Sequence, residues 1–191
     1  MLTGAFACLL IILFISLEGR VRLGNAAKSL ERSAEDQDST TYIGLAHGIS
    51  MLTLILSLAL TDFGIAILPF ASLVGWIGLA IQLAGMGLRL WANVVLGEYY
   101  TRTLRVADAQ SVIQTGPYSK IRHPGYLGAM IMWLGAALAT TNWLAIILVP
   151  LCMIAAYSYR IRAEEALLAQ KIGEPYRAYQ QTTWRLIPFI Y

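Results

Sequence analysis

The stretch HPGYLGAMIMWLGAALATTNWLAIILVPLCMIAAYSY, residues 123–159, decides the fold because its 37 residues include no Asp, Glu, Lys or Arg. A single helix crosses a hydrocarbon core with about 20 residues, so this stretch is too long for one span. The polar tripeptide Thr-Thr-Asn at 140–142 divides it near the middle. The pattern therefore predicts two membrane helices, 126–139 and 143–159, joined as a tight hairpin.

Composition indicates that the rest of the chain is also largely in a membrane. Only 13% of the residues are charged and 58% are hydrophobic, whereas soluble domains have about 25% charged residues. Three further windows without charge, 1–17, 39–61 and 63–88, are near or above the length of a span. Helices are expected because they pair their own backbone groups in lipid. We predict an all-α integral membrane protein with five transmembrane helices.

Basic residues decide the topology. Of the 14 Lys and Arg, all but Arg89 lie in the segments 18–41, 98–125 and 160–191. If residues 63–97 form one span, these segments share one side, as the positive-inside bias requires. We expect the N-terminus outside the cell and the C-terminus in the cytoplasm. The net charge of +3 then reflects topology, and no nucleic-acid partner is expected.

The chain has two regions of different character. Residues 1–97 hold three spans and the loop 18–41, whose alternating charges favour a solvated cytosolic segment. Residues 98–191 hold a polar loop, the hairpin 126–159 and an amphipathic C-terminal segment, and we expect the catalytic core there. The apolar face of that last segment, expected against the membrane surface, contains Leu167, Leu168 and Ile172.

Small and aromatic residues within the spans have two interpretations. They line a lateral path for a lipid tail, or they let helices pack closely, which requires no ligand and is favoured. His47 lies near the cytosolic end of its span without an acidic neighbour in sequence, and it is interpreted as a hydrogen-bonded packing residue. The small and aromatic residues in question are Gly85, Gly87, Gly128, Gly135, Trp91 and Trp133.

The loop before the hairpin, GPYSKIRHPGYLG at 116–128, gathers basic and aromatic side chains where a helix must start. Pro117 and Pro124 fix φ and keep the chain extended up to that point. His123 therefore lies at a helix N-terminus, where unpaired N–H groups and positive partial charge favour an anionic ligand group. The cluster either cradles a zwitterionic ligand with a purine or acts as an interfacial anchor of Tyr, Arg and Lys.

A second polar cluster follows the last span. Arg160 and Glu164 are four residues apart and share one helix face. The turn at 140–142 folds this helix back, so both side chains return to the membrane surface where His123 lies. The alternative is a solvated ion pair on a helix. If the hairpin is formed, the two clusters are neighbours in space.

The second half of the chain resembles the isoprenylcysteine carboxyl methyltransferase family. Members of that family are integral membrane enzymes that use S-adenosylmethionine to methylate the carboxylate of a prenylated cysteine. The resemblance rests on an ordered set of motifs between residues 110 and 189: GPYSKIRHPGYLG, a short hairpin, RIRAEE, GEPYRAY and RLIPF. It implies S-adenosylmethionine as cofactor, no metal, and a lipophilic small-molecule or prenylated-cysteine acceptor that enters from membrane lipid.

The resemblance also implies site residues. Arg160 and Glu164 would face the substrate. A carboxylate acceptor is ionised near pH 7 and needs no base, so Arg160 would orient it and Glu164 would position Arg160. An amine acceptor would instead make Glu164 a candidate base. The cofactor pocket would contain Tyr118, His123, Pro124, Gly125 and Tyr126, with a strand on the cofactor's other side formed by Gln110, Ser111, Val112 and Ile113.

Three other functions compete with the carboxyl methyltransferase. Phospholipid and amine N-methyltransferases are distantly similar. Sterol-reductase-like membrane enzymes share an Arg-His near a membrane helix and use NADPH. A scaffold or transporter subunit without enzymatic activity is disfavoured because the polar residues gather at one face and do not follow a path through the midplane.

Overall fold

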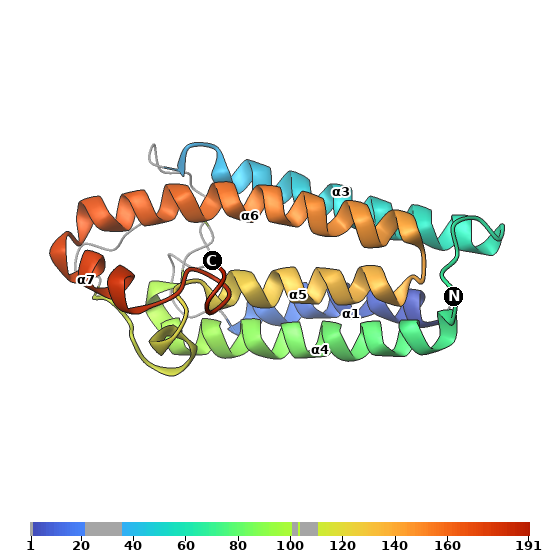
Figure 1. Cartoon of the computed structure of the whole chain (residues 1–191), viewed down its shortest axis with the longest axis horizontal. Coiled ribbons are helices and arrows are strands. Elements are labelled where there is room, and N and C mark those ends of the chain that lie inside the picture. Colours follow the sequence, from blue (N-terminus) through green and yellow to red (C-terminus); the bar gives the residue numbers. More distant parts are fainter. Residues whose placement is uncertain (1, 22–35, 101–102, 104–110) are drawn as a thin grey trace.

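The structure, a computed structural model, describes residues 2–21, 36–100, 103 and 111–191. In these residues it contains helices and connecting segments and no β-ladder longer than an isolated bridge. Figure 1 shows two layers, with α3 beside α6 in one and α1, α4 and α5 in the other. The elements are α1 (Leu2–Val21), α3 (Ser39–Asp62), α4 (Ala71–Leu96), the 3-10 turns η2 (Gly97–Tyr99) and η3 (Gly116–Ser119), α5 (Pro124–Ala139), α6 (Trp143–Lys171) and α7 (Glu174–Thr182).

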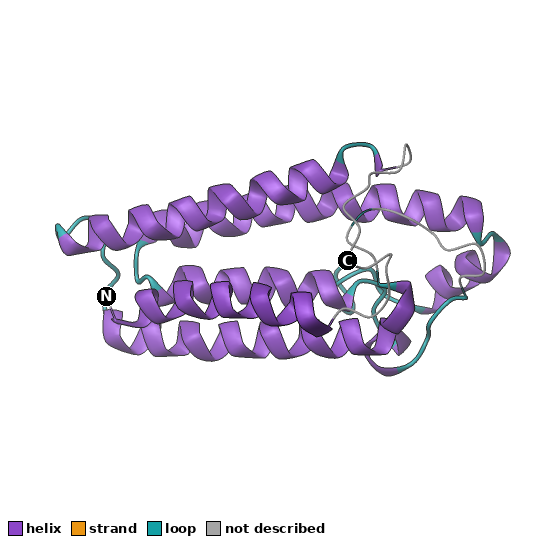
Figure 2. Cartoon of the chain, turned by 180° about the vertical axis from the view of Figure 1, so that it is seen from behind, coloured by secondary structure: helices purple, strands orange, loops and turns teal. Residues whose placement is uncertain are grey.

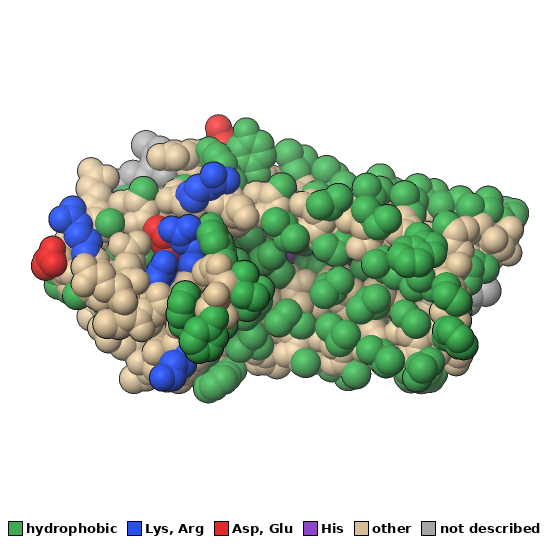
Figure 3. All heavy atoms as spheres, viewed as in Figure 1, with side chains coloured by type: hydrophobic (Ala, Val, Ile, Leu, Met, Phe, Trp, Pro, Cys, Tyr) green, Lys and Arg blue, Asp and Glu red, His purple; other side chains and the backbone are tan. Residues whose placement is uncertain are grey.

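The predicted all-α membrane architecture is confirmed. Four helices, α1, α3, α4 and α6, are long and apolar enough to cross a membrane, and α5 is a shorter apolar helix of 16 residues. Residues 71–96 form one unbroken helix, whereas residues 63–70 of the expected span 63–97 belong to the connection after α3. Figure 2 shows the same helices from behind, with their long axes roughly aligned. Hydrophobic side chains cover the bundle, and Lys and Arg gather at one end (Figure 3).

The Asn142 side chain stabilises the turn between α5 and α6. Its side-chain oxygen caps α6 by accepting a hydrogen bond from the Leu144 N–H (3.0 Å). Its Nδ2 donates to Thr61 Oγ1 (3.1 Å) and to the Ile65 carbonyl (3.0 Å). One side chain thus ties the hairpin to the end of α3, and α5 and α6 return antiparallel as predicted.

Close backbone contact joins α4 to α5. A Cβ built on Gly78 would lie 2.5 Å from the Ala139 nitrogen, and one on Gly128 would lie 2.6 Å from the Arg89 nitrogen. Seven-residue spacing puts the two glycines of each helix on one face. The glycine seam consists of Gly78 and Gly85 of α4 and Gly128 and Gly135 of α5.

The packing interpretation is therefore confirmed for three of the four glycines considered from the sequence. Gly87 is different, because a Cβ there would meet no atom within 4 Å. The two tryptophans also differ: Trp133 is buried in the core, whereas Trp91 is exposed on the outer surface. The seam explains how the short helix α5 is held without large interlocking side chains.

Gly135→Ala is expected to lower the free energy of unfolding by about 2 kcal/mol, because the new Cβ would overlap the Gln82 backbone nitrogen. Gly87→Ala is the matched control and should not destabilise the protein, since that position is open. Thermal unfolding of both variants in one detergent measures the difference. Equal melting temperatures would show that the helices are free to separate at the seam.

The interpretation of residues 18–41 as a solvated linker is wrong at the described ends of this segment. Glu18 and Asp36 are only 5% and 1% exposed. Glu18 accepts a hydrogen bond from Arg89 Nε (2.7 Å), and Asp36 pairs with Arg160 Nη1 (2.9 Å). A buried arginine requires a carboxylate partner, and these two acidic residues supply it.

Candidate active site

An open cavity lies at the polar end of the bundle, between the two layers, with a volume of about 1260 Å³ that includes space open to solvent. It brings together the two clusters that are separated in sequence by the hairpin. The predicted site residues that line it are Ser111, Val112, Ile113, Tyr118, His123, Gly125, Tyr126, Arg160 and Glu164.

Three predicted features differ from this arrangement. Pro124 is buried as the first residue of α5 and does not line the cavity. Gln110 lies outside the described residues. Residues 111–113 line the cavity as an irregular segment, not as the expected strand.

The Tyr126 hydroxyl connects the two clusters. It donates to Glu164 Oε2 (2.5 Å) and accepts from Arg160 Nε (3.2 Å). The Tyr126 ring stacks on the His123 ring, with centroids 5.5 Å apart and planes 7° from parallel. A tyrosine from the start of α5 therefore holds both polar groups of α6.

Arg160 is buried and fixed from the N-terminal end of α3. Its Nη1 donates to Asp36 Oδ1 (2.9 Å), Ser39 Oγ (2.7 Å) and Thr40 Oγ1 (3.1 Å). The alternative of a solvated Arg160–Glu164 ion pair is wrong, because Arg160 is 4% exposed and meets Glu164 through the tyrosine hydroxyl. The guanidinium plane is thus set by residues more than 100 positions upstream.

Arg89 is a second arginine at the cavity, with a side chain that is only 14% exposed, and no role could be assigned to it from the sequence. Besides its bond to Glu18, it donates through Nη1 to the Gly125 carbonyl (3.2 Å). Asn93 Nδ2 donates to the same Glu18 oxygen (2.8 Å). These bonds join α1, α4 and the start of α5. A lone arginine inside an apolar stretch of sequence indicates that it has a buried partner, but it does not identify that partner.

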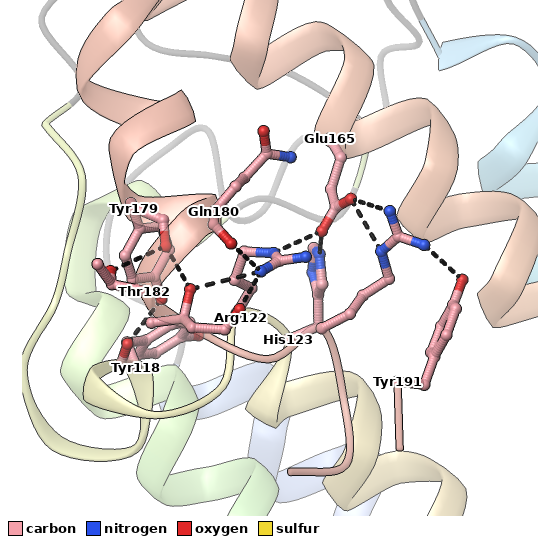
Figure 4. Close-up of polar contacts among 10 residues, drawn as sticks. Tyr118, Arg122, His123, Glu165, Tyr179, Gln180, Thr182 and Tyr191 are labelled. Atoms are coloured by element: carbon pink, nitrogen blue, oxygen red, sulfur yellow. Dashed lines mark hydrogen bonds and ion pairs between the residues drawn. The ribbon is translucent and has the colours of Figure 1, made fainter. Parts of the chain in front are cut away.

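Glu165 is the centre of a buried ionic cluster behind His123 (Figure 4). Its Oε1 accepts from Arg122 Nε (2.8 Å) and His123 Nε2 (3.1 Å). Its Oε2 accepts from Arg185 Nε (2.9 Å) and lies 2.8 Å from Arg185 Nη2. We call these four residues the Glu165 cluster. It fixes the loop before α5 to α6 and to the C-terminal segment.

Helix α7 closes over the same loop. Arg122 Nη1 donates to the carbonyls of Gln180 (3.0 Å) and Thr183. The Tyr179 hydroxyl donates to the Tyr118 carbonyl (2.7 Å). Burial raises the pKa of Tyr179 to about 12, against the opposing charge of Arg122, so the hydroxyl stays a donor near pH 7. The loop 116–123 is therefore held from both sides.

Comparison with known proteins identifies this arrangement. Residues 76–170 match the isoprenylcysteine carboxyl methyltransferase (ICMT) family. The chain belongs to this family. A solved structure of the eukaryotic intramembrane Ras methyltransferase ICMT shares its fold, with a TM-score of 0.66 and 23% identity over 93% of this chain and 61% of that chain.

Named relatives cover the same region. A probable protein-S-isoprenylcysteine O-methyltransferase of Oryza sativa subsp. indica is 33% identical over 119 residues, which is 61% of this chain and 62% of the relative. The protein-S-isoprenylcysteine O-methyltransferase of Xenopus laevis is 30% identical over 116 residues, which is 60% of this chain and 40% of the relative. The chain thus spans less than two thirds of the length of these relatives.

In this ICMT family member, Tyr176 of α7 is a cavity residue that sequence reasoning missed. It is 4% exposed, and its hydroxyl has no hydrogen-bond partner among the described residues. Burial first, and then the charges of Glu165 and Glu164, raise its pKa, so it stays protonated near pH 7. A buried hydroxyl without a partner costs about 1–3 kcal/mol, which a ligand group would recover. The sequence feature that could have pointed to Tyr176 is the GEPYRAY motif, in which it lies.

The C-terminal part of α6 also differs from expectation. The helix runs unbroken to Lys171, and Gly173, with φ of 76°, separates it from α7. Leu167 is buried, and Leu168 and Ile172 line the cavity, so the proposed membrane-surface face is wrong. Because α7 folds back, this face of α6 is turned toward the site.

His47 is hydrogen-bonded as interpreted from the sequence. Its Nδ1 bonds to the Ile43 carbonyl (2.7 Å), and its Nε2 lies 3.4 Å from the Tyr157 hydroxyl. Its ring packs edge-on against Trp133, with centroids 5.4 Å apart. His47 also lines the cavity, so it forms part of the wall on the α3 side.

Proposed function

We propose that this chain is a membrane methyltransferase that transfers a methyl group from S-adenosylmethionine to the carboxylate of an isoprenylcysteine-like or other lipophilic acceptor at the cytosolic face. The observation that carries the proposal is the bridge made by Tyr126. One hydroxyl joins the loop proposed to hold the methyl donor to Arg160 and Glu164 in the same cavity. The names of the relatives support the acceptor class.

The residues at the cavity fit S-adenosylmethionine. Tyr118 and Tyr126 offer aromatic faces for a purine, and Val112 and Ile113 add an apolar wall. The Tyr176 hydroxyl is a buried polar group that a ribose or amino-acid end would satisfy. When bound, S-adenosylmethionine supplies an activated methyl group on a positively charged sulfur. The chain's own residues need only align the acceptor and exclude water.

Arg160 suits a carboxylate acceptor. Its described contacts use Nε and Nη1, whereas a guanidinium carries five N–H donors. Because Asp36 and Tyr126 fix its plane in advance, the remaining donors orient a carboxylate by charge-assisted hydrogen bonds. Glu164 acts on Arg160 through Tyr126. No general base is required, since the acceptor is already ionised near pH 7.

A lipid tail would reach this site from the bilayer. Figure 3 shows a hollow between the two layers, where the charged end of the molecule meets the hydrophobic surface. An acceptor lying in the membrane would present its head group to the cavity while its tail stays among apolar side chains. The gathering of basic residues at this end favours the cytosolic side.

An amine acceptor is the second candidate, because the Glu164 carboxylate is at the cavity and within hydrogen-bond reach of Tyr126. The reductase alternative has no support from the family match. Calorimetric titration of the protein in lipid nanodiscs tests the cofactor. We expect saturable binding of S-adenosylmethionine and none of NADPH, and the reverse result would contradict the proposal.

Tyr176→Phe is expected to weaken S-adenosylmethionine binding about 5- to 10-fold, because one hydrogen bond contributes about 1 kcal/mol or slightly more. Tyr179→Phe is the matched control on the same helix. Its hydroxyl holds the Tyr118 carbonyl, so that change should lower the melting temperature more than Tyr176→Phe does. Unchanged affinity in Tyr176→Phe would remove the Tyr176 hydroxyl from the cofactor site.

A further inference from the structure

Residues 184–191, here called the C-terminal hook, fold back into a closed loop. The Leu186 and Ile187 N–H groups donate to the Tyr191 main-chain oxygen (2.8 and 3.0 Å), and the Tyr191 N–H donates to the Ile187 carbonyl (3.0 Å). The Trp184 and Phe189 rings pack with centroids 5.3 Å apart. The hook therefore has a defined shape set by its own hydrogen bonds.

This shape leaves large apolar side chains on the outside. Phe189 is 86% exposed and Ile190 is 77% exposed, and Trp184 and Ile187 are also exposed. Full burial of one such side chain is favourable by about 1.5–3 kcal/mol. A cluster of this kind, held outward by an ordered loop, marks a surface that is covered by a membrane or a partner.

The depth of the hook relative to the membrane distinguishes between these two ways of covering the apolar side chains. The hook pairs with the chain just before α5, where the Arg122 N–H donates to the Trp184 carbonyl (2.8 Å) and the Trp184 N–H donates to the Lys120 carbonyl (3.0 Å). The 16 residues of α5 rise about 24 Å, less than the roughly 30 Å of a hydrocarbon core.

The far end of α5 lies at the turn of residues 140–142, where the candidate spans α3 and α6 also have an end. We take this turn as one membrane boundary. Measured from that boundary, the start of α5 does not pass the opposite one. The hook lies beside the start of α5 in Figure 1 and Figure 2. Its apolar side chains are therefore level with the acyl and headgroup regions of the nearer leaflet.

Basic side chains accompany the hook. Lys120 is exposed, and the Arg185 side chain is 31% exposed and lies over the Tyr191 ring at 4.9 Å. Aromatic and basic residues together at this depth are typical of membrane-interface anchors. We propose that the hook inserts Trp184, Phe189 and Ile190 into the interface of the leaflet at the polar end.

The hook is also connected to the loop at the cavity. Arg185 follows Trp184 directly and binds Glu165, which holds Arg122 and His123. An inserted hook would therefore keep the loop 116–123 seated on α6. Insertion of the hook depends on the membrane and not on which acceptor the site takes.

Spin-label accessibility tests the anchor. In a chain with Cys8→Ala and Cys152→Ala that keeps the original melting temperature, a nitroxide is attached at Phe189→Cys or, as control, at Gln181→Cys, an exposed position on α7. Cys8→Val replaces Cys8→Ala if the latter destabilises the chain. Collision rates with oxygen, which concentrates in lipid, and with a water-soluble nickel chelate are then measured in phosphatidylcholine nanodiscs.

We expect the ratio of oxygen to nickel collisions to be several-fold higher at position 189 than at position 181. Equal ratios would show that the hook lies in water. Shielding of position 189 from both reagents would show that protein covers it, for example a second copy of the chain. Either of these two results overturns the anchor.

Discussion

Arg160→Lys is expected to lower kcat/KM for a carboxylate acceptor by roughly 30- to 1,000-fold, equivalent to about 2–4 kcal/mol, while the dissociation constant of S-adenosylmethionine changes little. A lysine ammonium cannot contact Asp36 and Tyr126 and still offer a planar pair of donors to the acceptor. Arg162→Lys is the matched control, since Arg162 is exposed and bonds to the Ser158 carbonyl on its own helix.

Glu164→Gln then distinguishes the two acceptor classes. With a carboxylate acceptor the change removes only a positioning contact through Tyr126, so partial activity should remain. With an amine acceptor it removes the proposed base, and activity should be lost. If Arg160→Lys and Glu164→Gln both turn over lipid acceptors at the original rate, neither side chain acts at the acceptor.

Glu165→Gln is expected to lower the free energy of unfolding by about 3 kcal/mol and the melting temperature by about 6–12 °C. The neutral amide cannot pair with Arg122 and Arg185, and it leaves two guanidinium groups and His123 around a site without negative charge. Because this cluster seats the loop before α5, binding of S-adenosylmethionine should weaken as well. Differential scanning fluorimetry and titration in the same detergent measure both effects.

Glu174→Gln is the control for that experiment. Its side chain is 80% exposed and lies 4.0 Å from an exposed arginine, so the loss should be no more than about 0.5 kcal/mol. Equal melting temperatures of the Glu165→Gln and Glu174→Gln proteins would show that the Glu165 cluster does not stabilise the fold.

Much of the architecture follows from local patterns in the sequence. The uncharged stretch around Asn142 predicts the hairpin, since a polar turn must interrupt so long an apolar run. Arg89 is compatible with one long span, and the basic segments then fall at one end. The hairpin in turn brings Arg160 and Glu164 next to His123, which is why nine predicted residues line one cavity.

The partners of the buried charges were not predictable. Asp36 and Glu18 lie in a charged segment that looks solvated, and only tertiary packing brings them to Arg160 and Arg89. Glu165 directly follows Glu164 in a helix and therefore lies on another face of it. Nothing in the sequence indicated that Arg122, His123 and Arg185, far away along the chain, would converge there.

His123 illustrates the same limit. Its place at a helix N-terminus suggested either a ligand-binding side chain or part of an interfacial anchor. Its bond to Glu165 shows that it also belongs to the ionic cluster that holds the loop. A change at His123 is therefore expected to affect both binding and stability.

Transfer of a radiolabelled methyl group tests the proposed methylation of a lipophilic carboxylate. The protein in nanodiscs is given S-adenosylmethionine labelled in its methyl group, together with an N-acetylated prenylcysteine, the same compound with its carboxylate converted to an amide, or phosphatidylethanolamine. We expect label in the prenylcysteine alone, released as methanol by mild base because the product is a methyl ester. Base-stable label in the phospholipid, or label in none of the three, would contradict it.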